Sequence, residues 1–419
     1  MVIWLRKRLR WLAIGLLLLI LLFVGGDEFR LNPAQQTASP YTYDLVQWEA
    51  SNFLSKWIHR LTRTLPWNRL SKEEQRQRVI DYFQMNEEVR TLRYALTQAI
   101  AQAGSGGSAE VTDLESQLDR LKAIRNELRN DVEETIEATI SSVLADDGLS
   151  TLGEFLFPPV DVRLGEPPRL LVTSPRDRIE RTHDVLIKPD VKVEERQRVE
   201  EELLTESDLA ALVINIGGVA TYPASIPGSQ SMRWTLQISA HEWLHHYFFF
   251  RPLGQNMFDS AEMQTLNETI ASLVGREIGD RAFLMLGGSI EVSSPALLLE
   301  SLPTDDDQKN DVRFDFDEEM RLTRLRVDEL LGEGRIEEAE TYMEQRRNIF
   351  VENGFFIRKL NQAFFAFNGT YGESPASVSP IGDQLHEFRA LVPDLGTFVG
   401  RVAGISSYQE FLDNLERLK

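Results

Sequence analysis

The segment His241-Glu242-Trp243-Leu244-His245 decides how this chain is interpreted. Two histidines four residues apart lie one turn apart on the same face of an α-helix, so both imidazoles can reach one metal ion. Glu242 adjoins the first of them, where its carboxylate can take a proton from a water molecule on that metal. The flanking residues are mostly apolar, which predicts a helix buried in a domain core. The segment therefore predicts a metal site with a general base beside it.

The composition restricts what such a site can be. Cysteine is absent, so thiolate ligands, cysteine nucleophiles and disulfides are excluded, and a metal must be held by histidine and carboxylate groups. Only six histidines occur in 419 residues, and three of them lie between positions 241 and 246. The formal charge of −20 argues against a nucleic-acid partner, which requires a basic face. Apolar residues make up 42%, which favours a folded globular chain over a disordered one.

A third ligand is expected on the next predicted helix, because a catalytic zinc ion has three protein ligands and one open position. That helix carries the segment Asn267-Glu268-Thr269-Ile270-Ala271-Ser272. Together with the preceding histidine segment, it resembles the gluzincin zinc peptidases, the thermolysin-like clan. The resemblance implies one Zn²⁺ per chain, held by His241, His245 and Glu268, with Glu242 as the general base.

The same resemblance places two further side chains beside the ligands. Ser272 stands where this clan often has an aspartate that orients the first histidine, and Asn267 precedes the third ligand. A hydroxyl supports a metal ligand less strongly than a carboxylate does. Two other acidic residues, Glu262 and Asp259, stay open as alternatives to Glu268.

Substrate contacts are expected from two other parts of the chain. Residues 218–226 resemble the edge strand that lies beside the active-site helix in this clan and pairs with an extended substrate. This implies substrate contacts by Gly218, Val219, Ala220 and Thr221. Clan members often use a distant histidine or tyrosine to hold the oxyanion, and the candidates here are Tyr371 and His386. The alternative for Tyr371 is an ordinary loop aromatic, and the alternative for His386 is an ordinary surface histidine.

The pattern along the chain predicts a mostly helical α+β protein in five parts. Four basic residues precede the apolar run 11–24, which is typical of a signal anchor or signal peptide with the N-terminus inside and the body outside the cytoplasm. The expected parts are this segment (1–26), a juxtamembrane linker (27–42), a helical region (43–149), a zincin-like domain with a small sheet (150–290) and a helical C-terminal subdomain that completes the cleft (291–419).

The region 43–149 is expected to contain a separable antiparallel helical hairpin. Ser71 with Glu74 and Thr112 with Glu115 form capping boxes before apolar residues at helical spacing. The glycine-rich stretch 103–108 separates the two helices. Such a hairpin is first of all a packed core and secondarily a surface for self-association.

Two functions follow as hypotheses. The first is a membrane-tethered zinc peptidase that hydrolyses peptide bonds of a peptide or protein substrate with metal-activated water, outside the cytoplasm. The second is a non-catalytic zincin-fold binding or scaffold protein that acts through its helical hairpin. Ser272 in place of aspartate favours the second hypothesis, and the intact Glu242 favours the first.

Overall fold

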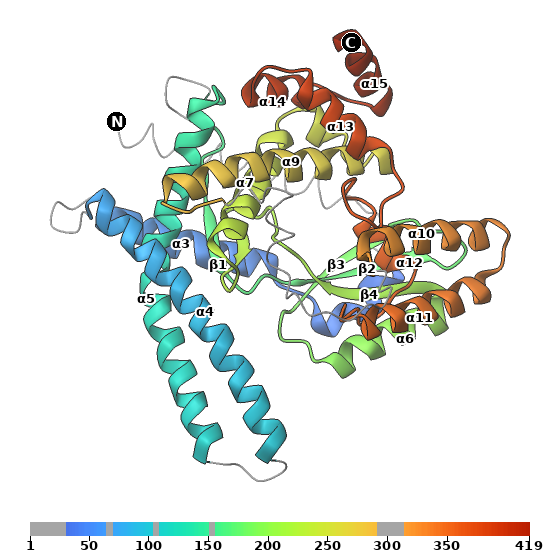
Figure 1. The fold of residues 1–419 in the computed structure, drawn as a ribbon, viewed down its shortest axis with the longest axis horizontal. Helices are drawn as coiled ribbons and strands as arrows, with labels where there is room; N and C mark the ends of the chain where they lie inside the picture. Colours follow the sequence, from blue (N-terminus) through green and yellow to red (C-terminus); the bar gives the residue numbers. More distant parts are fainter. Residues whose placement is uncertain (1–30, 64–69, 104–108, 151–155, 291–313) are drawn as a thin grey trace, which may run out of the picture.

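The computed structural model describes residues 31–63, 70–103, 109–150, 156–290 and 314–419 (Figure 1). Within these ranges the chain is mostly helical with two small sheets, which confirms the expected mostly helical α+β class. The expected N-terminal anchor, residues 1–26, lies outside the described residues. No helix in the described ranges combines the length and the apolar character needed to cross a bilayer.

Five helices make up most of the N-terminal half. They are α2 (Pro33–Ala38), α3 (Leu45–Arg63), α4 (Lys72–Ala103), α5 (Ala109–Asp146) and α6 (Val193–Ser207). Helices α4 and α5 form the expected antiparallel hairpin, and the end of α4 and the start of α5 lie away from the body (Figure 1). The capping box at Ser71 is present, because the Ser71 amide donates to Glu74 at 2.8 Å. The box expected at Thr112 is wrong, since α5 already begins at Ala109, a strong helix former.

The juxtamembrane linker expected for residues 27–42 is also wrong for its described part, because this part contains the helix α2. Asn32 caps α2, and its Oδ1 accepts a hydrogen bond from the Gln35 amide at 2.8 Å. Pro33 occupies the first helical position, where its missing N–H costs nothing. Ala34 and Ala38 are fully buried against α6 and the sheet. The polar composition of this stretch therefore reflects a short capped helix, not a spacer.

The hairpin is not separable from the rest of the molecule. The second half of α5 contributes Val132, Ile136, Ile140, Val143 and Leu144 to the largest apolar core, which it shares with α7 and α9. All five side chains are almost completely buried. The expected independent unit is thus replaced by one long helix that projects at one end and supports the central core at the other.

Two small sheets lie beside this core. The first is antiparallel with strand order β3-β2-β4, and the second is a parallel pair, β1-β5. Their bounds are β1 (Val162–Gly165), β2 (Arg169–Pro175), β3 (His183–Ile187), β4 (Leu209–Asn215) and β5 (Ala224–Pro227). Helices α2 and α6 cover one face of the three-stranded sheet, and α12 packs on its other face.

The remaining helices include the central pair, α7 and α9. Their bounds are α7 (Met232–Phe249), α8 (Pro252–Gln255), α9 (Ala261–Met285), α10 (Phe316–Gly332), α11 (Ile336–Glu352), α12 (Gln362–Asn368), α13 (Ile381–Ala390), α14 (Leu395–Ala403) and α15 (Tyr408–Leu418). The C-terminal part, expected as one subdomain, contributes to two cores. Helices α13 to α15 join the α7–α9 core, and α10 to α12 form a core that extends onto the sheet.

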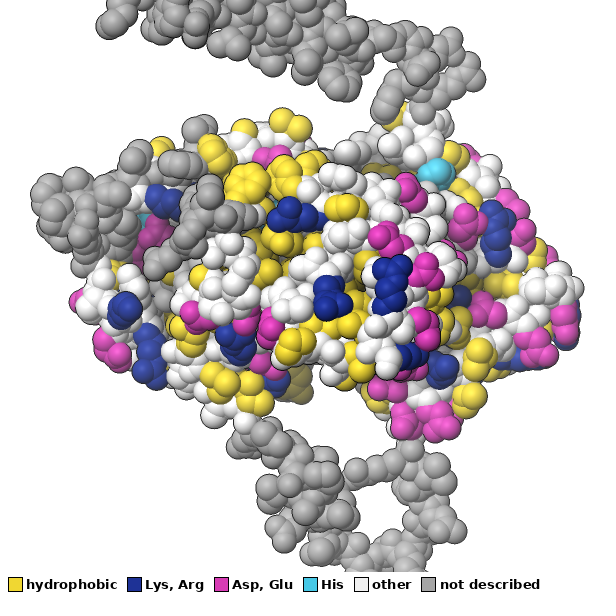
Figure 2. Space-filling model, turned by 90° about the horizontal axis from the view of Figure 1, so that it is seen from above, with side chains coloured by type: hydrophobic (Ala, Val, Ile, Leu, Met, Phe, Trp, Pro, Cys, Tyr) yellow, Lys and Arg dark blue, Asp and Glu magenta, His cyan; other side chains and the backbone are white. Residues whose placement is uncertain are grey.

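The surface charge is mixed on the face that Figure 2 shows. Lys and Arg side chains lie among Asp and Glu side chains there, with apolar side chains between them. The net charge of −20 therefore does not gather into one acidic field on this face.

Candidate metal centre

Helix α7 is fixed in the core on several sides. Its N-terminus is capped by Ser231, whose hydroxyl accepts from the Trp234 amide. Trp243 is 1% exposed, and its indole N–H donates to the Pro158 carbonyl at 2.8 Å. A helix buried on most faces cannot rotate without loss of packing. The direction in which His241 and His245 point is therefore set by the core.

Helix α9 packs closely against α7 because small residues recur at every fourth position. Ala271, Gly275 and Gly279 have this spacing. A Cβ on Gly275 would lie 3.0 Å from the backbone nitrogen of His241, and a Cβ on Gly279 would lie 2.4 Å from the Cα of Gln237. Neither glycine is among the residues expected at the site. Glycines four apart inside an apolar helix were the available signal.

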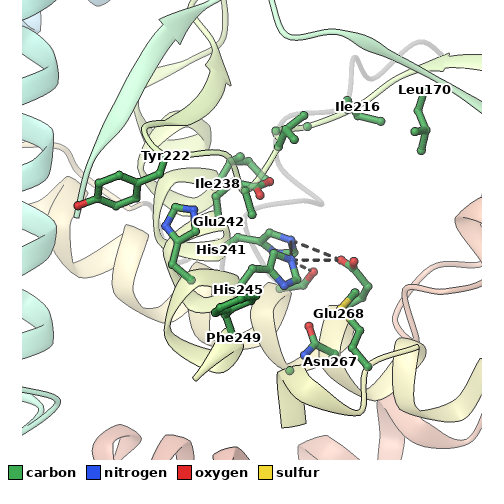
Figure 3. Close-up of a pocket in the computed structure, with 18 of the residues that line it drawn as sticks. Leu170, Ile216, Tyr222, Ile238, His241, Glu242, His245, Phe249, Asn267 and Glu268 are labelled. Carbon is green, nitrogen blue, oxygen red and sulfur yellow. Dashed lines mark hydrogen bonds and ion pairs between the residues drawn. The ribbon is translucent and has the colours of Figure 1, made fainter. Parts of the chain in front are cut away.

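The close packing brings three predicted ligands together (Figure 3). Nε2 of His241 and Nε2 of His245 lie 3.0 Å apart, and Oε2 of Glu268 lies 3.5 Å and 3.6 Å from them. Ligand atoms bound to a tetrahedral zinc ion at about 2.1 Å are roughly 3.4 Å from one another. The spacing of the three atoms thus fits a single metal ion, although the geometry alone does not select zinc.

The electrostatics of the site follow from burial and charge. Burial alone would lower the pKa of His245, but the Glu268 carboxylate beside it raises that pKa to about 9. Burial alone would raise the pKa of Glu268, but the two imidazoles hold it well below its ordinary value. The carboxylate of Glu268 is therefore held in its ionised form, which is the form that binds a metal ion.

Glu242 lies in the same cleft as the ligands and is 5% exposed. Burial raises the pKa of its carboxyl, and the neighbouring imidazoles act in the opposite direction. Gly218 lies directly against this carboxylate, since a Cβ at that position would be 2.4 Å from Oε1 of Glu242. A buried carboxyl with a raised pKa is suited to accept and release a proton near neutral pH.

Two residues of α9 lie next to the ligands. The hydroxyl of Ser272 is 3.4 Å from Nδ1 of His241, so it contacts the ring nitrogen that does not face Glu268. Asn267 is fully buried, and its Nδ2 donates to the Leu253 carbonyl at 3.4 Å. Ser272 thus contacts a predicted ligand directly, whereas this contact of Asn267 is to the backbone of α8.

The cleft around these residues has a volume of about 960 Å³ and is mostly apolar. Its walls come from α7, α9, the sheet and the loops between them (Figure 3). The apolar lining residues include Leu170, Leu186, Ile216, Ile238 and Phe249. Such a cavity with a few convergent polar groups is typical of a substrate-binding site.

The expected strand 218–226 is replaced by a turn and a short strand. The chain bends back on itself, so that Val219 pairs with Ser225 through two backbone hydrogen bonds of 3.0 Å, and only residues 224–227 form β5. Gly218, Val219 and Ala220 line the cleft. Thr221 is not a lining residue, and its hydroxyl donates to the Pro223 carbonyl at 2.7 Å. The bend is what brings Gly218 against the Glu242 carboxylate.

Of the two oxyanion candidates, Tyr371 lies in the cleft and His386 does not. The amide of Gly372 donates to the Thr269 hydroxyl at 2.8 Å, which ties the loop of Tyr371 to α9. Burial raises the pKa of Tyr371 well above its ordinary value, and the Glu268 charge adds to this shift. His386 lies on α13, where its side chain is 55% exposed and contacts Glu373 at 2.7 Å. The expectation for His386 is therefore not met.

The alternative acidic ligands also lie apart from the histidines. Glu262 is exposed in the first turn of α9 and lines a neighbouring cavity, and Asp259 is exposed before that helix. Arg181, which is not among the expected site residues, reaches the cleft from the segment between β2 and β3. Its Nε donates to Asp184 at 2.9 Å. Nothing in the local sequence distinguishes this arginine from the exposed ones.

Comparison with known proteins adds no assignment: no protein-family model, no curated protein and no solved structure matches the chain.

Proposed function

We propose that this protein is a zinc-dependent peptidase whose ligands are His241, His245 and Glu268 and whose general base is Glu242. The observation that carries the proposal is the convergence of the three ligand atoms at spacings of 3.0 to 3.6 Å. Two imidazole nitrogens and one carboxylate oxygen form a donor set typical of catalytic zinc sites. The cleft beside them supports a catalytic role over a structural one, since structural zinc sites are closed by four protein ligands.

The residues of the chain would divide the chemistry among them. When bound, the zinc ion would polarise the scissile carbonyl and lower the pKa of a water molecule at its open position. Glu242 accepts the proton of the attacking water and delivers it to the leaving amine nitrogen as the C–N bond breaks. Its burial keeps competing solvent away from that proton transfer. Glu242 therefore serves in turn as general base and general acid.

Two other groups are suited to hold the substrate. Val219 uses its backbone N–H and C=O to pair with Ser225, so the backbone groups of the preceding residue, Gly218, point away from that pairing. There they can pair with an extended substrate. Tyr371, with its raised pKa, keeps its phenol proton and can donate a hydrogen bond to the developing oxyanion.

The proposal includes the membrane tether that the N-terminal sequence predicts. The apolar run 11–24 and its basic flank support an anchor with the body outside the cytoplasm. The lipid bilayer would then be a partner of the N-terminal segment alone, and the cleft would act on peptides or proteins near that surface.

Hydrolysis of unfolded casein by the purified full chain tests the proposal. We expect cleavage that stops when a chelator removes the metal and returns when zinc is added. Glu242→Gln should retain zinc but lose at least about a hundredfold in rate, because an amide cannot accept the proton of water. A protein that holds one zinc ion and cleaves nothing would contradict the peptidase proposal and favour a non-catalytic binding protein.

A further inference from the structure

We infer that the cleft takes internal segments of extended polypeptides with large apolar side chains next to the cleaved bond. This inference rests on the peptidase function proposed above and assigns it an endopeptidase specificity. Three independent observations carry it: the aromatic rim of the cleft, the engagement of every charged group in its wall, and a second cavity that continues it.

Exposed aromatic side chains, here called the aromatic rim, line part of the cleft. Phe157, Phe249, Phe250 and Phe258 all line the cleft, and they are 45%, 69%, 51% and 81% exposed. A single exposed phenylalanine is ordinary on a protein surface, but four along one cleft are not. They offer apolar contact area to side chains that enter the cleft, and the inner wall continues the same character.

No charged group in the described wall of the cleft is left to hold a chain terminus. The charged lining residues there are Arg181, Glu242 and Glu268, besides the histidines. Glu268 faces the two imidazoles, Glu242 is the proposed base, and Arg181 is ion-paired with Asp184. An aminopeptidase needs an uncommitted carboxylate for the α-ammonium group, and a carboxypeptidase needs an uncommitted cation for the α-carboxylate. The wall therefore suits a substrate without a nearby terminus.

The groove extends beyond the metal centre. A second cavity of about 850 Å³ shares Arg181 and Phe258 with the first. Its lining is more polar and includes Glu180, Gln264 and Arg324. A polypeptide that crosses the metal centre can thus continue past Phe258 into this second space. Apolar residues would be favoured next to the cleaved bond and polar residues farther along the chain.

Peptides blocked at both termini test this inference directly. One internally quenched peptide carries Phe and Leu around its central bond, a second carries Asp and Lys there, and an aminoacyl anilide reports exopeptidase activity. We expect kcat/KM to be at least about tenfold higher for the apolar peptide, with internal cleavage by mass spectrometry and no anilide hydrolysis. Equal rates for the two peptides, or stepwise release of terminal residues, would overturn the inference.

A matched pair of variants locates the specificity. Phe258→Ser should raise KM for the apolar peptide about tenfold with little change in kcat, because the contact is made in the bound state. Phe356→Ser is the control, since Phe356 is 89% exposed and does not line either cavity. Unchanged KM in Phe258→Ser, together with weaker binding to phosphatidylcholine vesicles, would assign the rim to a bilayer and overturn the inference.

Casein hydrolysis distinguishes a failure of the specificity inference from a failure of the proposed peptidase function. Cleavage of casein without preference for the apolar peptide defeats only the specificity. Absence of all zinc-dependent cleavage defeats the peptidase proposal itself, whatever the rim does.

Discussion

The hydroxyl oxygen of Ser272 lies 3.4 Å from Nδ1 of His241, on the ring nitrogen opposite to the one that faces Glu268. This contact orients the imidazole but polarises it weakly, because a hydroxyl carries no charge. Ser272 and Glu268 both lie on α9, so this helix supplies one proposed ligand and also the group that orients His241 on α7.

Two replacements of Ser272 should change the metal affinity in opposite directions. We expect Ser272→Ala to weaken zinc binding about tenfold, and Ser272→Asp to strengthen it, because a carboxylate accepts the Nδ1 proton and raises the basicity of Nε2. Competition with a chromogenic chelator measures both dissociation constants. If all three proteins bind zinc equally, the Ser272 contact has no role in the site.

The contact between Gly218 and Glu242 predicts a variant that harms catalysis but not folding. In Gly218→Ala the new Cβ would lie 2.4 Å from Oε1 of Glu242, and the flexible carboxylate must move away. We expect kcat to fall by about one to two orders of magnitude, with zinc content and melting temperature nearly unchanged. Gly217→Ala is the control, since its Cβ meets its nearest atoms at an ordinary 3.6 Å. Equal kcat in the two variants would show that the placement of Glu242 is not limiting.

The glycines of α9 predict a stability effect at the helix contact. A Cβ in Gly279→Ala would lie 2.4 Å from the Cα of Gln237, so α7 and α9 must separate at a cost of about 1–3 kcal/mol. Gly400→Ala, within α14, meets no atom within 4 Å and should instead stabilise by about 0.5–1 kcal/mol. Urea unfolding of both variants measures the difference. Similar changes in the two would mean that the close packing of α7 and α9 is not needed.

A buried ion cluster joins α3 to α5 and β1, and it predicts a second stability effect. Lys56 is 4% exposed and ion-paired with Asp161 at 2.6 Å and with Glu137. Lys56→Met would remove the buried cation of this cluster and leave the two carboxylates only Arg60, which pairs with Glu137 at 2.7 Å and with Asp161 at 3.4 Å, at a cost of about 3–5 kcal/mol. Lys122→Met removes a surface lysine 4.0 Å from Asp119 and should change the unfolding free energy by less than about 1 kcal/mol. A loss below about 1 kcal/mol in Lys56→Met would show that water reaches this cluster.

Local sequence patterns predict the two helices that carry the site, α7 and α9. Ser231 and Ser260 cap α7 and α9, and apolar residues at helical spacing follow each of them. The sequence therefore predicted both helices and the face shared by His241 and His245. The small sheet was also expected, and each of its strands β2, β3 and β4 is a short run rich in branched apolar residues.

Features that depend on distant partners could not be predicted in the same way. Strand β1 has four residues and exists through its pairing with β5, far along the chain. The apolar stripe of α5 has the same pattern at both ends, and nothing in that pattern says which end packs into the core. Tyr371 and His386 were equal candidates in sequence, and only the path of the chain separates them.

The zinc content of Glu268→Gln tests the central proposal most directly. Glu262→Gln is its control, because it makes the same change on the same helix at an exposed position. Elemental analysis of the purified full chain should give one zinc ion for the wild type and for Glu262→Gln, and close to none for Glu268→Gln, with unchanged circular dichroism in all three. Full zinc occupancy in Glu268→Gln, or its loss in Glu262→Gln, would contradict the assignment of Glu268 as the third ligand and with it the proposed metal centre.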